Sequence, residues 1–155
     1  MKKILALVIA TLFISGCGIM KCTMLDDCRS TPAAEADILN IPAKRLFSYK
    51  EPERDFASII IIRDDNFVDS ECFDLLSVNG SQVARIGIKE RIELKVEPGE
   101  LVIKASINDP YGPSRCNPIG DRTIIREFVI SQGQTKKFRI VHNLMPMDID
   151  IQRSE

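Results

Sequence analysis

The chain lacks tryptophan, has a single histidine and carries no excess of charge of either sign. Its 21 Lys and Arg residues and 22 Asp and Glu residues leave a net charge of −1, so no basic surface for nucleic acid is expected. One histidine also disfavours His-rich metal sites and most histidine-based acid–base mechanisms. The 45% hydrophobic and 28% charged residues are typical of a globular chain, and 155 residues suffice for one domain.

The first apolar run is too short to span a membrane as a helix. Residues 4–14 are uncharged and apolar and follow Lys2 and Lys3. They have the length of a signal-peptide core and fall short of the about 20 residues of a spanning helix. The run ends in Ile14-Ser15-Gly16-Cys17, which resembles a bacterial lipoprotein signal: an aliphatic residue, two small residues and the cysteine that accepts the lipid. An ordinary secretory signal with a chance cysteine is the alternative.

The lipoprotein resemblance implies that residues 1–16 are a signal peptide and that Cys17 receives a diacylglycerol thioether and a further acyl chain such as palmitate. The remaining 155 − 16 = 139 residues would carry a net charge of (21 − 2) − 22 = −3. Each buried CH₂ of an acyl chain contributes about 0.8 kcal/mol, so two or three chains hold a protein on a membrane. By the same resemblance Gly18, in place of an Asp, implies the outer membrane of a cell envelope, with the domain facing the periplasm.

Four further cysteines form an even set in an exported chain, which favours disulfides in one of three pairings. These are Cys22, Cys28, Cys72 and Cys116. Their spacing contains no Cys-x₂-Cys, so neither a metal nor another cofactor is expected. We predict a Cys72–Cys116 bond because both residues belong to the domain, and a Cys22–Cys28 bond because these two lie close in sequence. Closing the longer loop should stabilise the fold by about 3–4 kcal/mol.

The mature chain divides into a tether and one domain. Residues 17–41 are predicted to be the lipidated N-terminus and tether, with Thr31 and Pro32 able to start a short helix. From residue 42 the apolar residues alternate, so residues 42–155 are predicted to form the domain.

Short segments with strand periodicity follow one another along the domain. The run Ile59-Ile60-Ile61-Ile62 is apolar on both faces and predicts a central strand. Residues 108–122, which contain three Pro and two Gly, break the pattern and predict a long loop. The strand candidates are residues 45–50, 56–63, 72–79, 82–88, 91–97, 100–107, 123–130, 135–142 and 147–152.

The dipeptide Asn79-Gly80 is the strongest hairpin signal in the sequence. With a two-residue turn there, Asp74 falls opposite Arg85, a favourable cross-strand pair. That register places a set of apolar residues on one face: Phe73, Leu75, Ala84, Ile86 and Ile88.

Two more hairpins are predicted from turn residues. Pro98-Gly99 lies between two alternating segments whose inward residues match, with Val96 on Leu101 and Leu94 on Ile103. The same register sets Glu93 opposite Lys104. Residues 131–134 are predicted to join the segments on either side of them as a third hairpin.

Together these elements predict an all-β fold, an antiparallel β-sandwich of about seven to eight strands. Residues 76–85 (LSVNGSQVAR), together with residues 92–105 around Glu97-Pro98-Gly99-Glu100, are similar to the PEGA-type domain and to bacterial lipoproteins with the same strand and turn plan. The resemblance covers about a third of the chain, which lacks the Pro-Glu-Gly-Ala segment itself. It implies a small transthyretin-like β-sandwich in an envelope protein, without catalytic residues.

No group of residues forms a recognisable catalytic pattern. His142 ends a predicted strand, and no Gly-x-Ser-x-Gly motif accompanies it. Asp64-Asp65-Asn66 lacks the glycine and closing Glu of a calcium loop. Asp148 and Asp150 share one face of a strand, which indicates protection of a sheet edge.

The loop at residues 108–122 is the predicted binding site. Long irregular loops in compact domains are often functional, and Tyr and Arg are enriched at protein contacts. Tyr111, Arg115 and Arg122 are therefore the candidate partner-binding residues. The short basic segment at Lys136, Lys137 and Arg139 is the alternative location, although it is more typical of a solvated strand.

The sequence thus predicts a non-enzymatic lipoprotein that acts as a protein-binding or assembly module, with an envelope protein as partner and the membrane reached through its lipid. A periplasmic enzyme inhibitor or small hydrolase is the second possibility, and a passive structural component of the envelope is the third.

Overall fold

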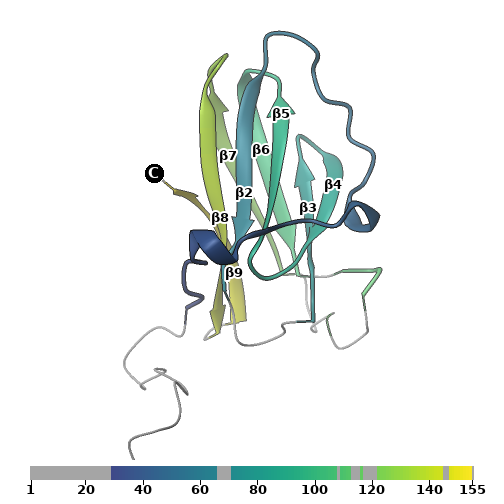
Figure 1. Cartoon of the computed structure of the whole chain (residues 1–155), viewed down its shortest axis with the longest axis vertical. Coiled ribbons are helices and arrows are strands. Elements are labelled where there is room, and N and C mark those ends of the chain that lie inside the picture. Colours follow the sequence, from purple (N-terminus) through teal and green to yellow (C-terminus); the bar gives the residue numbers. More distant parts are fainter. Residues whose placement is uncertain are drawn as a thin grey trace, which may run out of the picture.

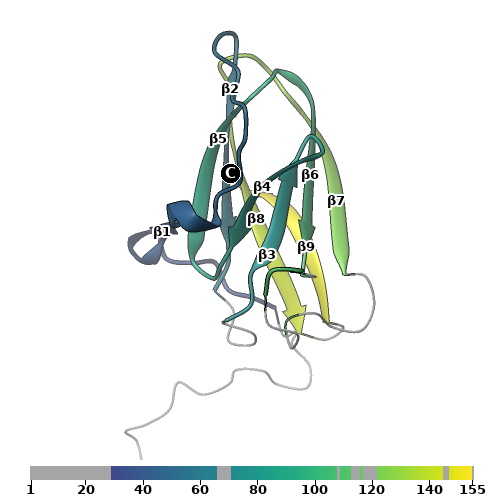
Figure 2. The same cartoon turned by 90° about the vertical axis from the view of Figure 1, so that its right-hand side faces the viewer.

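The computed structural model describes residues 29–65, 71–107, 109–112, 116, 122–144 and 147–154. Within these residues nine strands form two sheets that pack against each other, as Figures 1 and 2 show from two sides. The predicted all-β sandwich is therefore confirmed. In the described part of the chain no helix has the length and apolar character needed to cross a membrane.

The first sheet has five strands in the order β1-β5-β2-β8-β9. The long run of isoleucines lies in the central strand, as predicted, and Ile59 and Ile61 are fully buried. β2 pairs in parallel with β8 and β1 in parallel with β5, whereas the other two pairings of this sheet are antiparallel. The strand bounds are β1 Leu39–Asn40, β2 Ala57–Arg63, β5 Glu90–Val96, β8 Thr135–Leu144 and β9 Met147–Ser154.

The second sheet has four antiparallel strands in the order β4-β3-β6-β7. β3 and β4 form the predicted hairpin, and both turn residues, Asn79 (φ 47°) and Gly80 (φ 81°), have the positive φ that a type I′ turn requires. The strand bounds are β3 Asp74–Val78, β4 Ser81–Ile86, β6 Gly99–Ser106 and β7 Thr123–Ile130.

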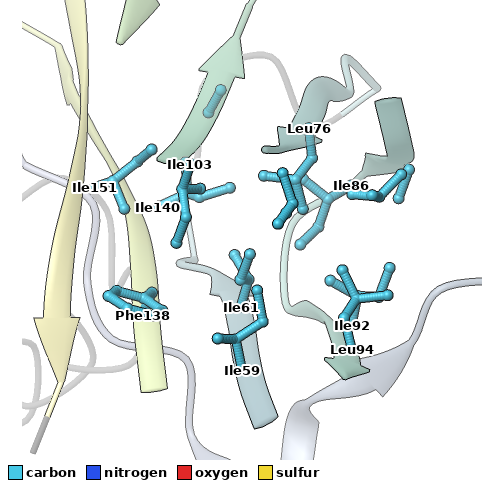
Figure 3. Packing of buried hydrophobic residues seen from close by; sticks show 14 of the residues in the cluster. Ile59, Ile61, Leu76, Ile86, Ile92, Leu94, Ile103, Phe138, Ile140 and Ile151 are labelled. Carbon is cyan, nitrogen blue, oxygen red and sulfur yellow. The ribbon is translucent and has the colours of Figure 1, made fainter. Parts of the chain in front are cut away.

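The hydrophobic core lies between the two sheets and takes residues from both. In Figure 3, Ile59 and Ile61 of β2 lie between Phe138 of β8 and Ile92 of β5. Leu76, Ile86 and Ile103 meet them from the four-stranded sheet.

Two predicted hairpins are wrong, because each turn carries the chain from one sheet to the other. β5 pairs with β1 and β2, whereas β6 pairs with β3 and β7, so Glu93 does not lie opposite Lys104. In the same way residues 131–134 connect β7 of one sheet to β8 of the other. Val96 and Leu101 both face the core, but from opposite sheets. A hairpin within one sheet and a connection between two packed sheets bury the same face of each strand. The alternation of apolar residues is therefore identical in both and cannot distinguish them.

The register within the β3–β4 hairpin also differs from the prediction. The pairing shifts by one residue after Ser77↔Gln82, so Leu75 lies opposite Arg85 and Asp74 lies opposite Ile86. This irregularity lets β4 bury both Val83 and Ala84. The buried apolar side chains of β3 are Leu76 and Val78, whereas Leu75 and the preceding Phe73 are only partly buried. A bulge of this kind inserts one residue into a strand and is not visible in the apolar pattern.

Residues 29–41, assigned from the sequence to the tether, cross the outer face of the five-stranded sheet (Figure 1). We call this segment the N-terminal strap. It contains β1 and one turn of 3₁₀-helix, η1 (Glu35–Asp37), rather than a helix capped by Thr31. The strand predicted at residues 45–50 is absent: η2 (Ala43–Arg45) occupies its start, and Leu46 forms a single bridge to Ala84 at the edge of β4.

Candidate functional site

The two ends of the sandwich differ in character. Residues 64–65, 71–73, 87–89 and 109–112 gather at the lower end in Figure 1, which we call the loop end. The opposite end holds the tight turns at residues 79–80, 97–98 and 131–134, and we call it the turn end. The predicted binding loop therefore starts at the loop end.

A disulfide joins this loop to the segment that precedes β3. Cys72 and Cys116 are bonded, as predicted, with their Cα atoms 5.3 Å apart and both residues buried. The bond holds the chain near Cys116 against the residues that precede β3. Cys17, Cys22 and Cys28 lie outside the described residues.

The segment Asp109-Pro110-Tyr111-Gly112 forms a tight turn that positions an exposed ring. The amide of Gly112 donates to the carbonyl oxygen of Asp109 (3.0 Å), and the amide of Tyr111 donates to Asp109 Oδ1 (3.0 Å). A Cβ at Gly112 would lie 2.8 Å from Asp109 Oδ2, so a larger residue does not fit there without movement. Asp109 is fully buried, whereas Tyr111 is 59% exposed.

Arg85 of β4 fixes the buried carboxylate of this turn. Its Nε donates to Asp109 Oδ2 (2.9 Å), and its Nη2 donates to the same oxygen. The side chain of Arg85 is 18% exposed. The partner of Arg85 is thus Asp109 rather than Asp74, because the shifted register places Arg85 opposite Leu75, while Asp74 is buried.

A second arginine lies beside the first and is held in the same way. Arg45 of η2 donates from Nη1 to Glu90 Oε2 (2.8 Å) and from Nη2 to Glu90 Oε1. The amide of Gly87 donates to Glu90 Oε2 (2.7 Å), and a Cβ at Gly87 would lie only 2.9 Å from that oxygen. Both arginines are therefore neutralised by carboxylates of the chain itself.

Aromatic rings stack on the two guanidinium groups. The centroid of Phe73 lies 4.3 Å from Arg45 Cζ and 5.0 Å from Arg85 Cζ, and Tyr111 lies 5.8 Å from Arg85 Cζ on the same measure. Phe47 packs on Tyr111 at a centroid distance of 5.7 Å. Such contacts are favourable by about 0.5–1 kcal/mol each where exposed. We call Arg45, Phe47, Phe73, Arg85 and Tyr111 the Arg–aromatic cluster.

The three predicted binding residues have different outcomes. Tyr111 belongs to the cluster, and Arg115 lies outside the described residues. Arg122 is half-buried before β7, where its carbonyl oxygen accepts a hydrogen bond from the amide of Ile107 (3.1 Å).

The basic segment of β8 is engaged with the rest of the chain. Lys136 donates to the carbonyl oxygen of Val129, Lys137 pairs with Glu35 of the strap (3.3 Å), and Arg139 pairs with Asp64. Lys137 and Arg139 are thus paired with carboxylates of the chain itself, which makes them less available to an acidic ligand.

Two further acidic side chains singled out in the sequence, Asp65 and Asp150, are paired as well. Asp65 pairs with Lys89 (Nζ–Oδ2 2.9 Å), and Asp150 of β9 pairs with Arg126 of β7 (2.8 Å). The hydrogen bond to Asp65, together with its charge, raises the pKa of Lys89 above its ordinary value of 10.5. Asp150 thus links the edges of the two sheets.

His142 was predicted to end a strand; it lies within β8, which continues to Leu144, and it belongs to a buried network. Its Nε2 lies 2.8 Å from Asp74 Oδ2, and the same oxygen lies 3.3 Å from Arg63 Nε. Arg63 also donates to the carbonyl oxygens of Cys72 (2.6 Å) and Ile86 (3.1 Å). Arg63 and Asp74 are each 1% exposed, so this network is closed to solvent. Within the described ranges no three His, Cys, Asp or Glu side chains are placed to hold a metal ion.

No protein-family model, curated protein or solved structure matches the chain. The resemblance to the PEGA-type domain therefore stays a prediction.

Sequence reasoning missed Arg45, Phe47 and Phe73, because they come from segments far apart in the chain. One signal was available: Asp109-Pro110-Tyr111-Gly112 has the residues of a tight turn, with Asp first, Pro second and Gly fourth.

Proposed function

We propose that this protein is a lipid-anchored, non-enzymatic envelope protein that binds another protein through the Arg–aromatic cluster. The observation that carries the proposal is the presentation of Tyr111: the residue is 59% exposed, while Asp109, which holds its backbone, is fully buried.

Several features favour binding at the cluster over a decorative role. Tyr and Arg are the residue types that dominate protein–protein hot spots, and hot spots lie on well-packed surfaces. Side chains already held in place lose little conformational entropy when a partner binds. The turn, the disulfide and the two arginine–carboxylate pairs hold the ring of Tyr111 in this way.

The cluster offers little support for an enzyme. Its guanidinium groups are bound to carboxylates, which leaves neither arginine free to stabilise a developing negative charge. His142, the single histidine, is buried with Asp74 and Arg63 and faces the core. A hydrolase would need an accessible acid–base pair.

The proposed anchor is Cys17, which would place the domain on the periplasmic side of the outer membrane. Metabolic labelling with a fatty acid tests this part. We expect label on the wild-type chain and none on Cys17→Ser, which should also remain uncleaved. Equal labelling of the two proteins would overturn the anchor.

The binding proposal is tested by quantitative capture from detergent-solubilised envelopes. Tyr111→Ala should lose at least one protein that the wild type retains, while its thermal midpoint stays within a few degrees. Val129→Ala is the matched control, because Val129 is an apolar residue of β7 that is 71% exposed and lies outside the cluster. A Tyr111→Ala variant that is folded and captures the same proteins as Val129→Ala would place the binding site elsewhere.

A further inference from the structure

The chain enters the sandwich at the loop end. Arg29, the first described residue, forms a bridge with Asn143. The amide of Ser30 donates to the carbonyl oxygen of His142 (2.7 Å), and Ser30 Oγ accepts from the amide of His142 (3.0 Å). Thr31 and Asp65 exchange two backbone hydrogen bonds of 3.0 and 2.9 Å. The entry point is therefore fixed next to residues 64–65.

The N-terminal strap adds no reach to the chain before it. The amide of Leu39 donates to the carbonyl oxygen of Lys89 (2.8 Å), and the amide of Ile41 donates to that of Arg91 (3.2 Å). Ile62 and Val141 are 3% and 1% exposed, although they face away from the core, because the strap covers that side of the sheet. Only the residues between Cys17 and Arg29 can separate the domain from the acyl chains.

That separation is shorter than the domain. Cys17 and Arg29 are 29 − 17 = 12 positions apart, which gives a mean span of about 20 Å for a flexible coil. β8 has ten residues and is therefore about 33 Å long. To bring the turn end to the membrane, the segment would have to run back along the whole domain, close to its maximum length of about 40 Å. A Cys22–Cys28 bond would shorten that maximum to about 25 Å, because a bonded Cα pair of about 5.5 Å replaces six residues.

We propose that the loop end faces the bilayer that holds Cys17, so that the Arg–aromatic cluster meets a membrane-embedded protein near the bilayer surface. This inference rests on the proposed anchor at Cys17 and on the binding role of the cluster. It names the class of partner: a protein with a segment exposed close to the lipid headgroups. A protein that is confined to the middle of the periplasm would meet the turn end instead.

The absence of tryptophan makes the orientation measurable. Single tryptophans are introduced at the loop end by Tyr111→Trp or Glu71→Trp, and at the turn end by Gln132→Trp or Gln82→Trp; all four positions are exposed. The lipidated proteins are reconstituted into vesicles whose headgroups carry dansyl, and energy transfer from tryptophan is recorded. We expect transfer from the loop-end positions to exceed that from the turn-end positions several-fold.

A second variant tests whether the short segment between Cys17 and Arg29 causes this orientation. Inserting about 20 Gly and Ser residues between Cys28 and Arg29 lengthens the mean span to about 30 Å. The preference for the loop end should then fall clearly, with the thermal midpoint unchanged. Equal or reversed transfer in proteins that float with the vesicles would overturn the orientation and leave the anchor intact. Failure to float would overturn the anchor, and the orientation with it. Preserved orientation without loss of capture in Tyr111→Ala would overturn the membrane-protein partner at the cluster.

Discussion

Two arginine–carboxylate groups lie at the same end of this molecule and differ in almost everything except composition. Arg63 and Asp74 are each 1% exposed and face the core, whereas Arg85 is 18% exposed and stacks between aromatic rings at the surface. The buried pair leaves Arg63 Nε and Asp74 Oδ1 without a hydrogen-bond partner, while Asp109 uses both of its carboxylate oxygens.

The difference shows what each group contributes. Removing charges from water costs several kcal/mol per ion, so the buried pair adds little net stability but penalises any structure that separates it. The surface pair keeps part of its hydration, and its guanidinium is available to position rings. The Arg63–Asp74 pair therefore constrains the fold, whereas the Arg85–Asp109 pair positions aromatic rings at the surface.

The largest effect is expected from breaking the buried pair. Asp74→Ala leaves Arg63 charged and unpaired in the core, so the free energy of unfolding should fall by about 3–5 kcal/mol. Urea denaturation measures the change. The double variant Arg63→Leu, Asp74→Leu should lose less than Asp74→Ala alone, since no isolated charge remains. A loss below about 1 kcal/mol for Asp74→Ala would contradict this account of the network.

The next largest effect is expected from removing the Cys72–Cys116 disulfide. Replacing Cys72 and Cys116 by Ala together should lower the free energy of unfolding by about 3–4 kcal/mol, because the unfolded chain regains the freedom of a long loop. Denaturation of the double variant, compared with the wild type under oxidising conditions, measures it. The variant should also lose capture through the cluster, whereas an unchanged unfolding midpoint would contradict a stabilising restriction of the unfolded chain by this bond.

Removing the carboxylate of the surface pair should cost less. Asp109→Ala leaves Arg85 and the amide of Tyr111 without their acceptor, which predicts a loss of about 1–3 kcal/mol and weaker capture. Asp109→Asn keeps an acceptor oxygen in the same place and is the matched control. If the two variants were equally stable and captured partners equally, the geometry of this carboxylate would be irrelevant.

The smallest effect is expected at a half-exposed pair. The pKa of Lys89 should lie above 10.5, first because of its hydrogen bond to Asp65 and then because of the nearby negative charges. A lysine whose pKa is raised in the folded state stabilises the fold at every pH below its unfolded pKa. This contribution is lost as the pH rises through the folded pKa, so the resulting change in stability falls at strongly alkaline pH. NMR titration of Lys89 measures it, and Asp65→Asn should bring the pKa back toward 10.5; an unshifted pKa in both proteins would contradict the role of this pair.

Much of the fold could be predicted because most strands have a polar and an apolar face. The segment at Thr123–Ile130 matches its predicted bounds, and the inward residues Ile92, Leu94 and Val96 are buried as expected. The partners of each strand could not be predicted, because a tight turn such as Pro98-Gly99 serves equally well within a sheet and between two sheets. The strap escaped prediction because its short elements are held by backbone hydrogen bonds to distant residues and have no apolar period.

The candidate site was predictable only in its most exposed part. Tyr111 was identified from its loop, yet the rest of the cluster comes from η2 and the residue after its end, from the residue before β3, and from β4, which only the folded topology brings together. The partner of Arg85 was predicted wrongly because one bulged residue in β4 changes which side chain lies opposite it.

The parallel pairing of β2 with β8 has a consequence for the order of assembly. Ser58 lies opposite Thr135, so the central pairing joins residues 135 − 58 = 77 positions apart. Closing so long a loop is entropically costly, and chains dominated by such distant contacts fold slowly. If the chain crosses a membrane with its N-terminus first, β2 emerges long before the strand that must lie beside it. In that case the pairing of β2 with β8 can form only after residues 135–140 have also been delivered, so completion of the five-stranded sheet would be a late step of folding.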